Sequence, residues 1–341
     1  WASRIAEYFR KIAFKHAMGS TKTQGSAANM KERTGFLLPW RLVFVIFATF
    51  CTVAGATYYA MGPLYVPSAI SGLILGVFGV LFGDLTKTAI AMTGVVVLAI
   101  VSQATPFWVS VFVLALLCAV LVGAELAHFG TRVGVLALMS RVTLNGPVSV
   151  ATEPAHLLIA FAAAVTAGLL LALALGLEAR VPPTHVAKRY AVGHGCALAI
   201  GLVLAQLIAT LFDNPHSHWI ALLFTVRALD PPGSNVAQAA SRGAATVAGA
   251  GLSGVAVLIP ASPVWFAVLG VAFVLAGLRY LPSGRPLSSG LMSGGIVLAS
   301  APTVETALFR AEAAILASLL VLFVFYLVST ILRALQSETA Q

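Results

Sequence analysis

The residues that could do chemistry in this chain gather in one short stretch, "SHWIALLFTVRALDPPGS" (217–234). The apolar run that begins at Trp219 covers only about 12 Å of helix, less than half of a hydrocarbon core of roughly 30 Å. Arg227, Asp230 and a Pro-Pro-Gly break follow it directly. The stretch is therefore either the end of a short membrane span or the working part of a transporter.

Arg227 and Asp230 are three residues apart, so on a helix they share a face and can neutralise each other. The two prolines after them have no N–H, which leaves backbone carbonyls exposed, and such breaks occur at membrane depth only beside a cavity or packed protein. We therefore predict a substrate or ion-path role for this pair. A cytoplasmic loop anchor is the alternative.

The segment that follows begins "SRGAATVAGAGLSG" (241–254), and its small residues allow helices to approach closely. Arg242 lies at the start of this segment, where it could meet an anion or simply follow the positive-inside rule. We predict that Arg227 and Arg242 attract a carboxylate, and that Trp219 and Phe224 contact its apolar body.

Protons need carriers, and histidine is the side chain that titrates near neutral pH. Asp230, His194 and His218 are the candidates for proton coupling, with Asp84 in the corresponding loop of the first half. For the histidines, an ordinary interfacial position is the alternative.

Composition assigns the class of protein. Hydrophobic residues make up 60% of the 341 residues and charged residues only 9%, with a mean hydropathy of +0.98. Soluble domains carry about 25% charged residues. The sequence therefore predicts a multi-pass membrane protein with an all-α fold.

The net charge of +9 does not indicate nucleic-acid binding, because seven of the 20 Lys and Arg residues precede the first predicted span and an eighth, Arg41, lies near its start. That distribution is typical of positive-inside orientation and of attraction to anionic membrane lipids. The sequence contains no phosphate-binding loop, no HExxH, no GxSxG and no Cys/His metal spacing. We therefore expect no catalytic residues, no metal site and no cofactor.

Residues 1–18 have the spacing of a basic amphipathic helix that lies in the membrane interface, and a polar linker follows to residue 35. Docking on a partner protein through 1–18 is the alternative. About twelve spans are predicted after it: 37–60, 64–82, 86–103, 106–124, 131–149, 154–177, 190–211, 216–230, 238–260, 263–280, 287–301 and 305–333.

The loops on the predicted inner side contain most of the cations, whereas Arg141 is the clear cation assigned to an outer loop. This asymmetry predicts that both termini are cytoplasmic. "ATPFWVSV" (104–111) also matches "ASPVWFAV" (261–268), which indicates two six-helix repeats. The predicted divisions are 1–35, a first repeat 36–178, a connector 179–189, a second repeat 190–334 and a tail 335–341.

The stretch "HWIALLFTVRALDPPGSNVAQAASRGAATVAGAGLSG" resembles the signature of the fusaric acid resistance and aromatic acid exporter family. In that signature an aromatic-Trp pair opens a span and R-x-x-G-T-x-x-G opens the next one. The matching residues here are Trp219, Arg242, Thr246 and Gly249. The sequence departs from it in two places, since His218 stands where Tyr is common and Ala245 replaces the first Gly.

The resemblance implies efflux of aromatic or other amphipathic carboxylic acids driven by the proton gradient. It also suggests kinship with plant aluminium-activated malate transporters, whose six-span subunits pair as dimers. The expected function is thus a plasma (inner) membrane exporter of organic anions, with membrane lipids, protons and a small organic anion as its partners. The alternatives are a passive organic-anion channel and a non-transporting scaffold subunit of a larger complex. The further partners expected are a second copy in a homodimer or a protein docked through residues 1–18.

Overall fold

The computed structural model describes residues 37–148, 153–178, 186–212, 214, 216–228, 236–281, 285–300 and 303–338. The predicted amphipathic helix (1–18), its linker, most of the 179–189 connector and Asp230 lie outside these residues.

Over the described residues the chain forms twelve α-helices and one 3-10 turn, with no strand. They are α3 (Trp40–Met61), η2 (Pro63–Tyr65), α4 (Val66–Phe82), α5 (Leu85–Ala104), α6 (Phe107–His128), α7 (Val133–Val148), α8 (Pro154–Ala174), α9 (Lys188–Ala209), α10 (Trp219–Ala228), α11 (Val236–Val257), α12 (Pro263–Tyr280), α13 (Pro286–Ser300) and α14 (Val304–Glu338). The all-α prediction is confirmed, and a helix is found at each of the twelve expected places.

Eight of these helices are long and apolar enough to cross a membrane, so the chain is a multi-pass membrane protein. Two of the remaining four, α7 and α13, are shorter apolar helices. Helix α10 has 10 residues, about 15 Å of rise, and α11 is long but carries polar residues in its first half. The count of twelve spans therefore stays a prediction.

The chain divides into two compact units. Unit 1 contains residues 50–203 and the end of α14 from residue 328, and unit 2 contains the start of α3 to residue 49 and residues 204–327. Helices α3, α9 and α14 thus contribute to both units, and each unit is described by itself.

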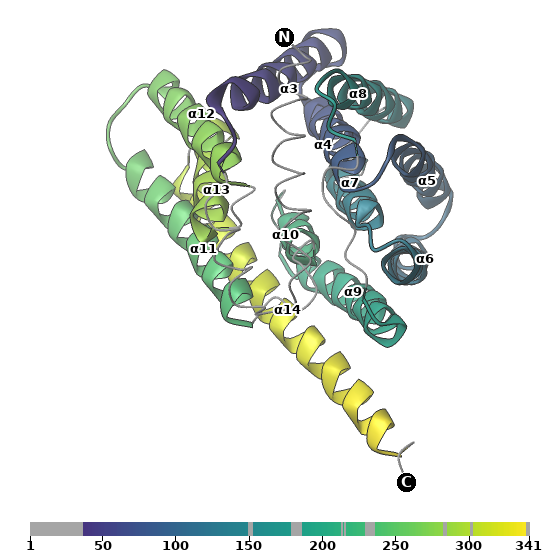
Figure 1. The fold of residues 1–341 in the computed structure, drawn as a ribbon. Coiled ribbons are helices and arrows are strands. Elements are labelled where there is room, and N and C mark those ends of the chain that lie inside the picture. Colours follow the sequence, from purple (N-terminus) through teal and green to yellow (C-terminus); the bar gives the residue numbers. More distant parts are fainter. Residues whose placement is uncertain are drawn as a thin grey trace, which may run out of the picture. The chain divides into compact units, whose positions relative to one another are not determined.

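In unit 1, helix α4 packs against α8 on one side and α7 on another (Figure 1). The contact with α8 is close because Gly72 has no side chain: a Cβ there would overlap the carbonyl of Phe161. Leu73 and Phe161 are fully buried in this interface, and the Ser68 hydroxyl donates to the Leu157 carbonyl at 2.7 Å.

In unit 2, helix α13 lies between α11 and α12 (Figure 1). A Cβ on Gly249 of α11 would overlap the carbonyl of Gly290 of α13, so the two backbones touch. The Ser253 hydroxyl spans the same interface to the Gly294 carbonyl at 3.0 Å. The small residues of the 241–254 segment therefore serve close helix packing.

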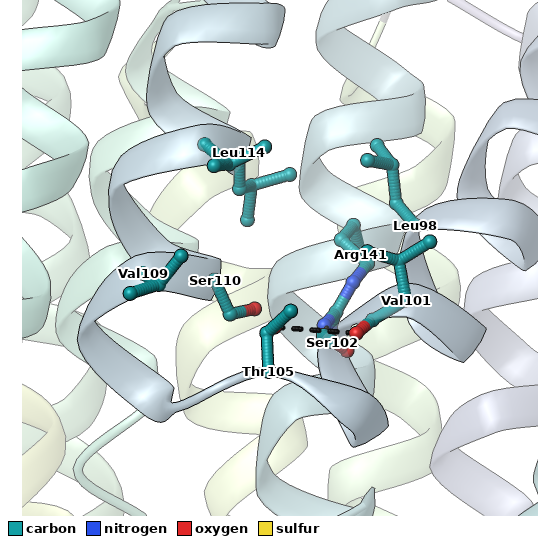
Figure 2. A pocket seen from close by; sticks show the side chains of 9 residues that line it. Leu98, Val101, Ser102, Thr105, Val109, Ser110, Leu114 and Arg141 are labelled. Atoms are coloured by element: carbon teal, nitrogen blue, oxygen red, sulfur yellow. Dashed lines mark hydrogen bonds between the residues drawn. The ribbon is translucent and has the colours of Figure 1, made fainter.

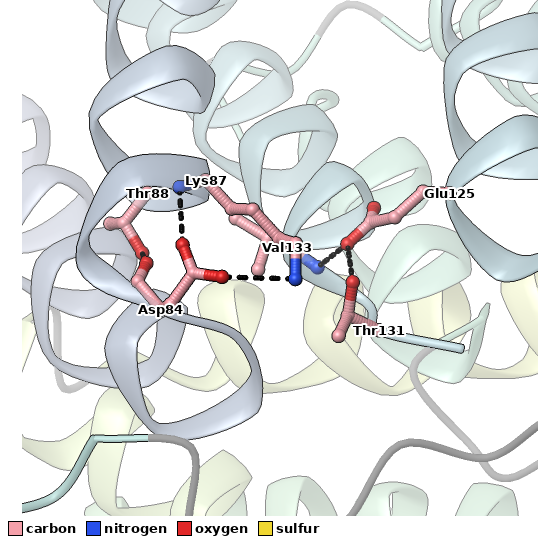
Figure 3. A network of polar contacts seen from close by, with 6 residues as sticks. All are labelled: Asp84, Lys87, Thr88, Glu125, Thr131 and Val133. Carbon is pink, nitrogen blue, oxygen red and sulfur yellow. Dashed lines mark hydrogen bonds and ion pairs between the residues drawn. The ribbon is translucent and has the colours of Figure 1, made fainter. Parts of the chain in front are cut away.

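Two carboxylates cap helix ends in unit 1 (Figure 3). Asp84 is the N-cap of α5: it accepts from the Lys87 amide at 2.7 Å and pairs with the Lys87 ammonium at 3.0 Å. Glu125 of α6 accepts from the Thr131 hydroxyl at 2.6 Å and from the Val133 amide at 2.8 Å, at the start of α7. Both stabilise helix N-termini, where otherwise unbonded N–H groups favour a negative charge.

The assignment of Arg141 to an outer loop is wrong. Arg141 lies in the middle of α7, is 3% exposed and donates to the Ser102 hydroxyl of α5 at 2.5 Å. Its position inside a helix reflects the local sequence, which continues apolar on both sides of the charge.

Candidate functional site

Arg227 occupies the last turn of α10 and is buried. Its Nη2 donates to the Thr246 hydroxyl of α11 at 3.1 Å. The same hydroxyl donates to the Arg242 carbonyl at 2.8 Å, one helical turn earlier. Thr246 therefore connects the guanidinium of one arginine to the backbone of the other.

Arg310, on α14, is 5% exposed, and its guanidinium carbon lies 4.6 Å from the centroid of the Trp219 ring. Its Nε is buried and has no hydrogen-bond partner in the described part of the chain. A cation over an indole face is stabilised electrostatically, more strongly when water is excluded. The ring contact does not use the Nε–H of Arg310 as a hydrogen-bond donor.

The three arginines form one cluster, since Arg227 lies within electrostatic reach of both Arg242 and Arg310. The described carboxylates of unit 2 are Glu305 and Glu312, and both are exposed. Guanidinium groups stay charged at every physiological pH. The cluster, Arg227, Arg242 and Arg310 with Thr246, therefore gives the inside of unit 2 a concentrated positive potential.

Aromatic rings lie beside the cluster. His216 stacks on Trp219 with 4.4 Å between centroids and an interplanar angle of 19°, and Phe309 lies 6.3 Å from the same indole. Burial is the larger cause that lowers the pKa of His216 below its usual range, and the positive charge of Arg310 is the second cause. At neutral pH His216 is therefore a neutral aromatic partner of Trp219.

The other residues predicted for the site are distributed as follows. Phe224 is fully buried in the core of unit 2, and His218 lies in the turn before α10, 6.4 Å from Trp219 between ring centroids. His194, stacked on Tyr190, belongs to unit 1, as does the helix cap Asp84. Asp230 is outside the described residues. Of the predicted set, Trp219, Arg227, Arg242 and His218 thus gather in one part of unit 2.

Two residues of this part of unit 2, Arg310 and His216, are not among the residues predicted for the site. A single arginine in the long apolar run of α14 is a signal that reasoning on buried charge could have used. No sequence pattern predicts that His216, which lies three residues before Trp219, stacks on the indole of Trp219.

Aromatic rings and guanidinium groups are thus buried together in this part of unit 2. In general, carboxylates accept paired N–H donors, and aromatic rings stack on one another. Within the described residues there is no group of three His, Cys, Asp or Glu side chains placed to hold a metal ion. No family model, no curated protein and no solved structure matches this chain.

Proposed function

We propose that the protein is a secondary transporter that exports aromatic carboxylic acids or related amphipathic anions, driven by the proton gradient. The observation that carries the proposal is the cluster of Arg227, Arg242 and Arg310 inside a multi-pass membrane protein. Charged side chains within membrane proteins are costly and usually mark substrate or ion pathways.

The roles follow from the contacts. Arg310 supplies a buried Nε–H donor, and Arg227 is oriented by Thr246, so both can meet a carboxylate. Trp219 receives the apolar body of the substrate, with Phe309 beside it. Phe224 has no exposed surface, and we assign it to the support of α10.

Proton coupling is proposed for Asp230, with His218, His194 and Asp84 as further candidates. His218 is the one of the three described residues that lies next to Trp219. The charge of the Asp230 carboxylate, three residues after Arg227 in sequence, would change the positive potential that an anion meets near the arginines. The occupancy of the anion site and of the proton site are then linked.

The architecture proposed with this function is two six-helix repeats, α3–α8 and α9–α14, in the plasma (inner) membrane with both termini cytoplasmic. The proposed kinship is with the fusaric acid resistance and aromatic acid exporters. Two motif residues have clear tasks that support it: Thr246 holds Arg227, and Gly249 lets α11 touch α13.

The test is flux of labelled benzoate into proteoliposomes, with and without an imposed pH gradient, for wild type and Arg310→Met. The matched control is Arg279→Met, because Arg279 also lies 4.6 Å from a tryptophan centroid, that of Trp40, but outside the cluster. We expect gradient-driven flux that Arg310→Met removes and Arg279→Met retains.

Three results would contradict the proposal. Equal flux in both variants would exclude the cluster as the binding site. Flux that ignores the pH gradient and reverses at the anion equilibrium potential would identify a channel. If no organic acid is transported and the protein co-purifies in a stable larger complex, the chain is a scaffold subunit.

A further inference from the structure

The start of α3 meets the end of α12 within unit 2, outside the arginine cluster. The Leu38 N–H donates to the Arg279 carbonyl at 3.1 Å, and the guanidinium carbon of Arg279 lies 4.6 Å from the centroid of the Trp40 ring. Both helices are long and apolar enough to cross a membrane. The contact therefore places the start of one span and the end of another at the same membrane surface.

Positive charge gathers at this surface. Arg41, the second residue of α3, is exposed, and Arg285 is exposed in the short connection between α12 and α13. Neither Arg41 nor Arg279 forms an ion pair with a residue that the structure describes. Guanidinium groups stay charged at every physiological pH, so the surface attracts anions.

The arginines at this surface differ from the buried arginine of unit 1. Arg141 is enclosed by helices and donates to the Ser102 hydroxyl (Figure 2). Arg279 lies in the last turn of α12, and no hydrogen bond from its side chain to the described residues is found beside the contact with the Trp40 ring. Arg41 and Arg279 are both at helix ends, where a group at the membrane surface can reach them.

Aromatic rings continue from these arginines along α3. Trp40 is 44% exposed, and Phe44, one helical turn further on, is 53% exposed. Their ring centroids are 5.8 Å apart. Tryptophan is enriched at the level of the lipid headgroups. The surface is thus charged at the helix end and apolar one turn deeper, which complements a molecule with an anionic head and an apolar tail.

We infer that Trp40, Arg41, Phe44 and Arg279 form a binding site for an anionic phospholipid. The two guanidinium groups donate charge-assisted hydrogen bonds to the phosphate. Trp40 lies beside the headgroup and Phe44 contacts an acyl chain. Basic surfaces between the ends of membrane helices are typical sites for acidic headgroups. A soluble anion would leave both exposed rings unused, and the site is separate from the arginine cluster proposed for transport.

The test is native mass spectrometry of the purified full chain, released from micelles with equal amounts of phosphatidylglycerol and phosphatidylcholine that have the same acyl chains. Both lipids contain the phosphate, but choline cancels its charge. We expect wild type to retain phosphatidylglycerol in preference. Arg41→Gln should weaken its binding about fivefold, the loss expected for one basic residue at a membrane surface. Arg41→Gln combined with Arg279→Gln should remove the preference.

The matched control is Arg189→Gln, because Arg189 is also exposed and is also the second residue of its helix, α9. It belongs to unit 1, so this variant removes the same charge and should bind phosphatidylglycerol like wild type. An excess of inorganic phosphate should not displace the lipid. Equal retention of both lipids by wild type, or equal dissociation constants for Arg41→Gln and Arg189→Gln, would overturn the inference. Displacement by inorganic phosphate would also overturn it, because the site would then bind a soluble anion.

Discussion

The contact between Thr246 and Arg227 can be tested by one isosteric substitution, Thr246→Val. The change removes the hydroxyl that accepts from the Arg227 guanidinium at 3.1 Å and keeps the shape of the side chain. Thr246 is 3% exposed, so water cannot easily replace the lost partner. A hydrogen bond to a charged group contributes about 1.5–3 kcal/mol, and we expect the free energy of unfolding to fall by about that amount.

The structure provides a matched control in Thr225→Val. Thr225 is fully buried on α10, and its hydroxyl donates only to the Leu222 carbonyl at 2.8 Å, inside its own helix. Both substitutions exchange a buried hydroxyl for a methyl group, but only Thr246 touches a cation. We expect Thr225→Val to cost about 1 kcal/mol or less.

The assay is unfolding of the purified chain in mixed micelles by titration with sodium dodecyl sulfate, followed by tryptophan fluorescence. Thr246→Val should unfold at a lower detergent fraction than Thr225→Val. In the flux assay it should also raise the benzoate concentration for half-maximal rate, because Arg227 is no longer oriented. Equal unfolding free energies for the two variants would refute the reasoning that Thr246 stabilises a buried charge.

Three further predictions use other parts of the chain. Gly249→Val should destabilise the protein by about 1–3 kcal/mol, since its side chain would overlap the backbone of α13, whereas Gly251→Val meets open space and should unfold close to wild type. Folding lowers the pKa of His216, so the unfolded chain binds the proton more readily than the folded chain. The free energy of unfolding should therefore fall as the pH drops below about 6.5. A His216→Gln variant whose unfolding has the same pH profile as wild type would contradict this. Asp84→Ala should cost about 0.5–2 kcal/mol through loss of the α5 N-cap. Burial raises the pKa of Asp84, but its hydrogen bonds and its ion pair with Lys87 lower that pKa by more, so the net shift is downward. In wild type the N-cap should therefore stabilise the protein down to about pH 4 and lose this effect at lower pH. Thermal unfolding at several pH values would measure the change.

The sequence by itself determined where the helices lie. In a membrane every backbone N–H and C=O must be hydrogen-bonded within the protein, so each long apolar run forms an α-helix. Pro and Gly residues mark the ends of these helices. Helix α12 begins and ends where the pattern predicts, at residues 263 and 280. Local sequence also predicted Arg227 and Arg242 as candidate site residues, because charge is rare in an apolar chain.

Only the tertiary structure decided which of these residues meet. Arg310 is 91 residues from Trp219 in sequence (310 minus 219), and it contacts the indole because the fold brings the beginning of α14 to the beginning of α10 within unit 2. Arg141 similarly reads as a loop cation until α5 and α7 place it against Ser102. The burial and partners of a charged side chain are set by neighbouring helices far away in sequence, and no local pattern contains that information.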